Sequence, residues 1–299
     1  MASGALAATG RVGPFITWLI HRQADDGHRL TTSRRHRKGL PPLAVAGADA
    51  DPGRAVEGLG NLWHRLWAPR RIGWWIAVSF LVGAALFALP SAAALWPQAR
   101  GLAAIDPLLQ GRLYAVGACF FTSAAFLQWL EAHNNDIAAL AAAVSTAQSR
   151  PPGRWRLFGW CPHNLGYLAS LIQFIGTLLF NLNTGDALLA GLDWRGQNLL
   201  VWTPDVLGSL CFLAASQLAL MEISHGAWSW RPRSVTWWIA VINLLGSVFF
   251  MISALAAFVL PPAEMAAPLL ANGGTFAGAL CFFAGAYLLI PELFETAAE

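Results

Sequence analysis

Charged residues are scarce in this chain of 299 residues. Asp, Glu, Lys and Arg together make up 12% of it, whereas hydrophobic residues make up 56%. A soluble domain usually carries about 25% charged residues, so this composition excludes an ordinary soluble protein. Lysine occurs once, at Lys38, while arginine and alanine are abundant. This bias is typical of a GC-rich bacterial genome.

Catalytic and nucleic-acid signatures are also absent from the sequence. It contains no nucleophile elbow, no HExxH, no phosphate-binding loop and no dinucleotide fingerprint. It has no basic face interleaved with aromatic residues on a soluble module, so nucleic acid is excluded as a partner. We therefore expect neither an enzyme nor a bound cofactor.

The sequence does contain long segments without a charged residue: 72–99, 113–130, 164–185, 206–221, 234–263 and 265–291. About 20 apolar residues in a helix cross the hydrocarbon core of a bilayer. A helix also satisfies the backbone groups that lipid cannot. The sequence therefore predicts an all-α integral membrane protein in contact with the lipid bilayer. Its transmembrane helices are expected at about 72–95, 112–131, 164–182, 204–222, 235–260 and 270–291.

The placement of arginine predicts the orientation of these helices. Most arginines lie before the first helix or in the second and fourth connections, and few lie on the opposite side. Short loops that carry positive charge stay in the cytoplasm. We therefore expect a bacterial plasma-membrane protein with both termini in the cytoplasm.

Two different segments precede the membrane domain of residues 72–299. Residues 1–53 are rich in Gly, Ala, Pro and Arg and have weak apolar periodicity, which indicates a disordered basic cytoplasmic tail. Residues 54–71 have apolar residues at helical spacing, which predicts an amphipathic helix. That helix either lies in the membrane interface or packs on the protein's own loops, and we favour the interface.

The apolar segments carry two alternating patterns. "WWIAVSFLVGAALF", "YLASLIQFIGTLLF" and "WWIAVINLLGSVFF" align on Gly83, Gly176 and Gly246. "GACFFTSA", "GSLCFLAAS" and "GALCFFAGA" align on Cys119, Cys211 and Cys281. The steps between the glycines are 93 and 70 residues, and those between the cysteines are 92 and 70 residues.

This matched spacing predicts three parallel two-helix hairpin repeats, at about 72–131, 164–222 and 235–292. Two crossings per repeat give all the repeats the same orientation, as in some transporters. We therefore expect the hairpins to surround a pseudo-threefold axis. The shared glycines, Gly83, Gly176 and Gly246, would let the helices of each hairpin approach closely.

Each repeat ends with a glutamate on the same side of the membrane, and further ionisable residues follow it. The set is Glu131, His133, Glu222, His225, Glu292 and Glu295. A ring of these side chains at the inner mouth of the bundle would attract cations or bind a divalent metal ion. Alternatively, the glutamates mark helix ends and pair with Arg231, Arg233 or the arginines of the tail. Ionisable residues at membrane depth are costly and often functional.

Other intramembrane residues have both a functional and a packing interpretation. Cys119, Cys211 and Cys281 would suit a soft metal if their thiols met on the axis, but cysteine is also a common small packing residue. Gln173 and Asn243 both lie three positions before a shared glycine. They would either line a cavity or form hydrogen bonds between helices. We favour packing in both cases.

The elements "LLGSVFF" and "GSLCFLAAS", paired in a two-helix unit, resemble the small bacterial YrhK-like membrane domain over residues 72–292. The resemblance implies a membrane location. That family has no established activity, so the resemblance implies none for this chain. Two functional hypotheses remain. The first is a channel or transporter for a small solute or ion, with its pathway near the repeat axis. The second is a non-transporting scaffold or regulatory subunit that binds a protein partner, or a second copy of itself, through its tail and tryptophan-rich surface.

Overall fold

The structure, a computed structural model, describes residues 5–12, 15–24, 27–40, 42–45, 66–99, 101–102, 105–135 and 156–294. Its largest part is a bundle of long helices: α2 (Ile72–Leu95), α3 (Pro107–Asn134), α5 (Leu165–Asp186), α7 (Thr203–Ser224), α8 (Val235–Ala256) and α9 (Pro268–Glu292). All 6 are long and apolar enough to cross a membrane, which supports a polytopic membrane protein.

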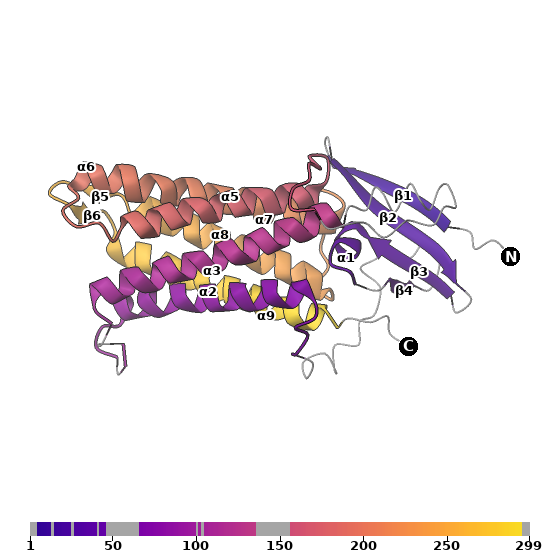
Figure 1. The fold of residues 1–299 in the computed structure, drawn as a ribbon, viewed down its shortest axis with the longest axis horizontal. Helices are drawn as coiled ribbons and strands as arrows, with labels where there is room; N and C mark the ends of the chain where they lie inside the picture. The colour runs from indigo at the N-terminus through magenta and orange to yellow at the C-terminus, as the bar shows by residue number, and fades with distance from the viewer. Residues whose placement is uncertain are drawn as a thin grey trace.

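The long helices form a closed ring in the order α2, α3, α5, α7, α8, α9 and back to α2. They run side by side along the long axis of the molecule (Figure 1). Between 33% and 44% of the apolar stretch of each helix is buried. Exposed apolar side chains such as Phe120, Leu178 and Leu245 cover the outside. This outward apolar surface is what a lipid environment requires.

The bundle end remote from α1 carries short elements that connect the long helices (Figure 1). α6 (Trp194–Gly196) and the π-helical turn η3 (Gln197–Trp202) lead into α7, and β5 (Val259–Leu260) pairs with β6 (Glu264–Met265). The amide of Asn198 bonds both backbone groups of Val259, at 2.8 and 2.9 Å. The helix expected over 235–260 ends at Ala256, because Pro261 and Pro262 cannot continue it.

An antiparallel sheet lies at the other end of the bundle (Figure 1). Its strands are β1 (Ala5–Val12), β2 (Phe15–Ala24), β3 (Gly27–Thr32) and β4 (Leu43–Val45), paired in that order. The short helix α1 (Ser33–Arg37) follows β3 and contacts α3, α5 and α7. The structure thus differs from the disordered tail that composition indicated for residues 1–53.

The reason for this difference lies in local sequence that average composition conceals. Residues 15–20, "FITWLI", are β-branched or aromatic at most positions, which favours a strand. Antiparallel strands satisfy their backbone groups on one another, and Ile20 and Leu30 are fully buried. Most of the predicted amphipathic helix of residues 54–71 lies outside the described residues. Its described end, residues 66–71, has a turn in which Arg71 donates to Ala68 O at 2.9 Å.

The shared glycines lie at close contacts between the two helices of each hairpin. A Cβ added at Gly83, Gly176 or Gly246 would lie 3.1, 3.1 or 3.2 Å from a glycine carbonyl oxygen of the partner helix. Those partners are Gly117, Gly208 and Gly278. Each partner glycine in turn contacts a phenylalanine one helical turn beyond the shared glycine. The same contact therefore occurs in each hairpin.

A further shared feature precedes α2, α5 and α8, and the sequence alignment missed it. A tryptophan or tyrosine near the start of each helix donates a hydrogen bond to the carbonyl eight residues earlier. These bonds are Trp74–Leu66 at 2.9 Å, Tyr167–Gly159 at 2.8 Å and Trp237–Ser229 at 2.7 Å. The residue after each acceptor begins a Trp-x-Pro sequence, at Trp67, Trp160 and Trp230. The steps between these tryptophans are again 93 and 70 residues.

Two adjacent glycines of α9 provide a test of how tightly α8 and α9 pack. A Cβ added at Gly274 would lie 2.8 Å from Phe249 O and 2.9 Å from the backbone N of Ser253, whereas one at Gly273 meets nothing within 4 Å. We expect Gly274→Ala to destabilise the protein by about 1–3 kcal/mol through overpacking. Gly273→Ala should be neutral or stabilising by up to about 1 kcal/mol. Thermal unfolding in detergent measures both, and equal shifts would contradict this packing.

Candidate functional site

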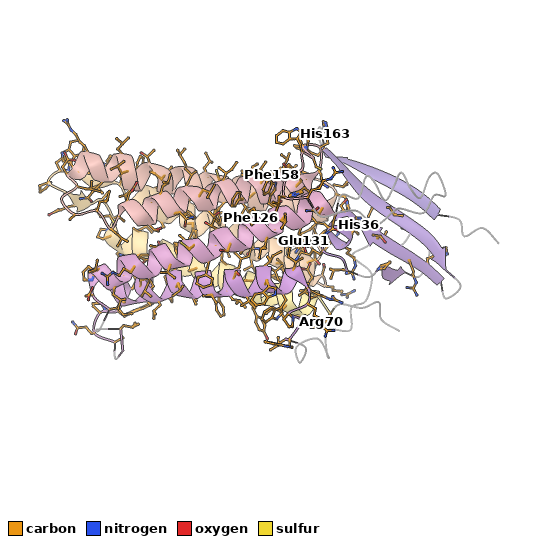
Figure 2. The ribbon with its side chains drawn as sticks, viewed as in Figure 1. His36, Arg70, Phe126, Glu131, Phe158 and His163 are labelled. Atoms are coloured by element: carbon orange, nitrogen blue, oxygen red, sulfur yellow. The ribbon has the colours of Figure 1, made fainter. Side chains whose placement is uncertain are left out.

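The predicted glutamates lie at the bundle end that faces α1. Glu131, Glu222 and Glu292 come from the last turns of α3, α7 and α9, and each is at most 2% exposed. Glu131 is labelled at this end of the bundle (Figure 2). Such burial of carboxylates is costly unless each finds a cation or hydrogen-bond donors. The negative charge of the three glutamates must therefore be compensated within the protein.

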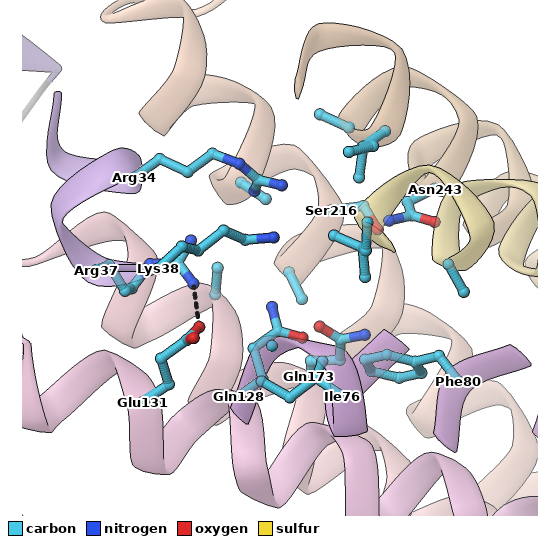
Figure 3. Close-up of a pocket in the computed structure, with 18 of the residues that line it drawn as sticks. Arg34, Arg37, Lys38, Ile76, Phe80, Gln128, Glu131, Gln173, Ser216 and Asn243 are labelled. Carbon is cyan, nitrogen blue, oxygen red and sulfur yellow. Dashed lines mark ion pairs between the residues drawn. The ribbon is translucent and has the colours of Figure 1, made fainter. Parts of the chain in front are cut away.

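α1 and the residue after it supply the compensating cations. Thr32 caps the helix, since its hydroxyl accepts from the backbone N of Arg35 at 3.3 Å. Arg37 and Lys38 follow Arg34 by three and four residues, and this spacing places both on the same side of the helix as Arg34. Figure 3 shows Arg37 paired with Glu131.

Glu292 is the most completely paired of the glutamates. Arg34 donates from Nε to Oε1 at 2.9 Å and from Nη2 to Oε2 at 3.2 Å, a two-point contact. Lys38 Nζ lies 2.6 Å from Oε2, and the hydroxyl of Thr236 donates to Oε1 at 2.9 Å. Burial of this carboxylate is therefore matched by two cations and a hydroxyl.

Arg37 lies between the other two glutamates. Its Nη2 donates to Glu222 Oε2 at 2.9 Å, and its Nη1 lies 3.9 Å from Glu131 Oε2 (Figure 3). Gly166 of α5 leaves the space, because a Cβ there would lie 2.7 Å from Arg37 Nε. The pairing is incomplete: Arg37 Nε, Arg37 Nη1 and Glu222 Oε1 are buried without a hydrogen-bond partner. Buried polar atoms usually have a partner, so these atoms mark where the pairing between α1 and the bundle is incomplete.

The position of Lys38 makes the docking of α1 sensitive to pH. Burial lowers the pKa of Lys38 to about 8, with Arg34 adding to the decrease and Glu292 and Glu131 opposing it. The ordinary lysine pKa is about 10.4. Between these two pKa values, Lys38 is mostly neutral when α1 is docked and mostly protonated when α1 is undocked. Docking therefore releases a proton, and rising pH favours docking.

We therefore expect the protection of residues 33–40 from hydrogen exchange to increase from pH 8 to pH 10, relative to Lys38→Met at the same pH. The comparison at equal pH removes the intrinsic pH dependence of exchange. If the ratio of wild-type protection to Lys38→Met protection stays constant or falls between pH 8 and pH 10, the lowered pKa of Lys38 is contradicted.

A polar cavity continues inward from the charged groups. Its volume is about 50 Å³, which holds about three or four water molecules at 10–15 Å³ each. Every long helix contributes to its wall, so it lies in the middle of the ring. Figure 3 shows the side chains around it. The polar ones from the bundle are Gln128, Glu131, Gln173, Ser216 and Asn243.

Phenylalanine side chains close the axis beyond this cavity. Phe87, Phe180 and Phe250 form one triangle, with ring centroids 6.5, 6.0 and 5.9 Å apart. A second triangle is formed by Phe121, Phe212 and Phe282, with centroids 6.3, 6.1 and 5.5 Å apart. The two triangles contact each other, and all their members are at most 6% exposed. The bundle is therefore closed at its centre as well as at its mouth.

Of the other predicted ring members, His133 is turned away from the glutamates. The ring of His133 bonds Arg156 O at 2.8 Å through Nε2 and lies 5.0 Å from Trp129. It faces away from Glu131 because residues two apart on a helix point to different sides. His225 follows the end of α7 with φ of 50°, and Glu295 lies outside the described residues.

The predicted metal sites are not formed in the part of the chain that the structure describes. No group of three His, Cys, Asp or Glu residues there could hold a metal ion. The cysteines do not meet on the axis, which the phenylalanines occupy. Cys119 is exposed, and the Cβ atoms of Cys211 and Cys281 face the shared glycines of α5 and α8. This geometry supports the packing interpretation. Gln173 and Asn243 both line the cavity, and the Asn243 side chain also packs against Gly285 of α9.

Comparison of the chain with protein-family models, with curated proteins and with solved structures finds no match.

Proposed function

We propose that this protein is a gated pathway for a small polar solute or ion, and that its structure is a closed state. The observation that carries the proposal is the polar cavity on the axis, with a contribution from every long helix. Polar side chains that line a cavity inside a membrane bundle are typical of a solute path. The cavity is bounded by the α1 cations at one end and by phenylalanines at the other.

We also propose that the path lies on a pseudo-threefold axis of three hairpin repeats. The glycine contacts and the aromatic hydrogen bonds each occur once per hairpin, and each hairpin contributes one phenylalanine to each of the two triangles. Parallel repeats with a solute site between them are a known transporter arrangement. Kinship with YrhK-like domains stays a prediction from the paired helix motifs.

The charged mouth should face the cytoplasm of a bacterial cell. Arginines flank the helices at this end, including Arg70, Arg156 and Arg231 (Arg70 in Figure 2). Positive charge in short connections keeps them on the cytoplasmic side. The tryptophans of the Trp-x-Pro sequences lie at the same end, as expected for an aromatic belt at the membrane interface.

Uptake by liposomes tests the proposal. The purified full chain is reconstituted, and a panel of labelled small ions and polar solutes is compared with protein-free liposomes. Leucine at Gln173 and Asn243 should abolish any uptake by filling the cavity. Gln217→Leu is the matched control, because Gln217 does not line the cavity. Absence of flux in the wild type and in the Phe121→Ala variant discussed below would contradict a pathway.

The closed axis also favours a second candidate, a scaffold or regulatory subunit. A bundle closed by two phenylalanine triangles needs no pathway, and Trp67, Trp160 and Trp230 are each more than 70% exposed. In that case the liposomes carry no flux, and a defined partner co-purifies from native membranes in fixed ratio. Serine at Trp160 and Trp230 should release that partner, whereas serine at the lipid-facing Phe120 should not.

A further inference from the structure

We propose that the three buried glutamates form a binding site for an organic cation that carries guanidinium or primary ammonium groups, and that α1 is the intramolecular occupant of this site. The inference rests on the proposed function, since it names the class of solute and the device that closes the mouth. The evidence comes from charge balance, from contact geometry and from incompletely paired atoms.

Charge balance shows that the mouth requires cations. Three carboxylates, each at most 2% exposed, face three cations that come from residues 34–38. Among the residues that the structure describes, every ion pair of these glutamates is made with this one segment. Within the described part of the bundle, the hydroxyl of Thr236 is the one hydrogen-bond donor to these glutamates that remains when α1 leaves. Uncompensated buried charge is costly, so a state without α1 favours another cation in its place.

Contact geometry favours an organic cation over a metal ion. Arg34 binds Glu292 through two parallel bonds, the arrangement by which carboxylates recognise a planar guanidinium. Lys38 shows that a primary ammonium binds the same carboxylate, at 2.6 Å. The described residues contain no compact group of ligands for a metal ion. A chain with a cationic group at each end can instead span carboxylates that one metal ion cannot reach together.

Incomplete pairing indicates that α1 fills the mouth imperfectly. Glu222 Oε1 lacks a hydrogen-bond donor, although its side chain is only 1% exposed. Arg37 Nε and Nη1 lack acceptors, although that side chain is 3% exposed and lines the cavity. A free cation could satisfy Glu222 better than α1 does. Competition between the two would couple the arrival of the solute to the withdrawal of α1.

Hydrogen exchange of the wild-type protein in detergent tests the competition directly. Backbone amides of Lys38, Gly39 and Leu40 bond carbonyls of α1, so they report its folding. The probes are agmatine and 1,4-diaminobutane, with NaCl at matched ionic strength and MgCl₂ as controls. We expect at least threefold faster exchange of these amides with either probe, with saturation. No acceleration, or equal acceleration by NaCl or MgCl₂, would overturn the proposal.

A chemical-rescue experiment gives an independent test. The variant Arg34→Gln/Arg37→Gln/Lys38→Gln removes the occupant's charge and should be less stable to heat than the wild type. Agmatine should raise its melting temperature by several degrees, and further replacement of Glu131, Glu222 and Glu292 by glutamine should abolish the rise. A folded variant without this response would overturn the proposal. If the variant does not fold, the wild-type exchange experiment still decides.

Neither experiment measures flux, so their failure is distinguishable from failure of the proposed function. If agmatine releases α1 but the liposomes show no flux, the cation site is supported and the pathway is contradicted. If the liposomes show flux but agmatine does not change hydrogen exchange, the pathway is supported and the cation site is contradicted.

Discussion

Replacement of Arg37 by methionine is expected to shift the docking of α1 toward the undocked state by about 3–5 kcal/mol, on the order of a hundredfold to several thousandfold. Arg37 is the cation nearest to both Glu131 and Glu222. Methionine fills similar volume but leaves two buried carboxylates without their guanidinium. Since α1 is short and contacts the bundle through α3, α5, α7 and the end of α9, the strain should be relieved by its withdrawal from the bundle and by hydration of the mouth.

Hydrogen exchange of residues 33–40 measures this shift, and circular dichroism shows whether the bundle stays folded. Arg233→Met is the matched control, because Arg233 is exposed in the connection between α7 and α8. The double variant Arg37→Met/Glu222→Gln should recover part of the loss, since it removes one stranded charge. Unchanged protection in Arg37→Met would mean that the ion pairs do not hold α1.

The sequence was sufficient to predict the membrane helices and the place of the glutamates. Long apolar runs without a charged residue predict membrane-spanning helices. α2 begins and ends at the predicted residues 72 and 95. Glu131, Glu222 and Glu292 could be predicted at one end because each follows its helix pattern at the same position. The ends of α8 and α3 were less certain, since proline and capping side chains such as Asp106 decide them locally.

The partners of the glutamates could not be predicted in the same way. The sequence left open a pairing with arginines of the tail, but it gave no reason to choose Arg34 and Arg37 among so many. That choice depends on a turn of helix after a β-strand, and therefore on tertiary structure. One signal was present: "RRHRK" at 34–38 is the densest run of basic residues in the chain.

The closure of the axis was also beyond sequence reasoning. The repeat alignment identified Phe87, Phe180 and Phe250 as equivalent, but not the direction in which they point. Helical periodicity alone does not distinguish a lipid-facing from an axis-facing phenylalanine when both surroundings are apolar. The structure separates them: Phe120 is 37% exposed, whereas the adjacent Phe121 is fully buried.

The second large effect is expected from a substitution at Phe121, the buried neighbour of Phe120. Phe121→Ala should destabilise the bundle by about 3 kcal/mol, toward the lower end of the range for buried Phe→Ala changes. The loss is one of packing, because lipid is as apolar as the bundle interior. Phe121 contacts Phe87 in the first triangle and Phe212 and Phe282 in its own, with centroids 5.3, 6.3 and 6.1 Å away. Its removal should therefore loosen both triangles.

The same substitution should extend the polar cavity toward the opposite side of the membrane. Phe80 and Phe282, which line that cavity, both contact the ring that is removed. Water can then pass the narrowest apolar layer, so liposomes with Phe121→Ala should take up small solutes faster than those with wild-type protein. Phe120→Ala, which changes only the lipid-facing surface, should leave uptake unaltered. If both variants behave alike, the phenylalanine triangles are packing and not a gate.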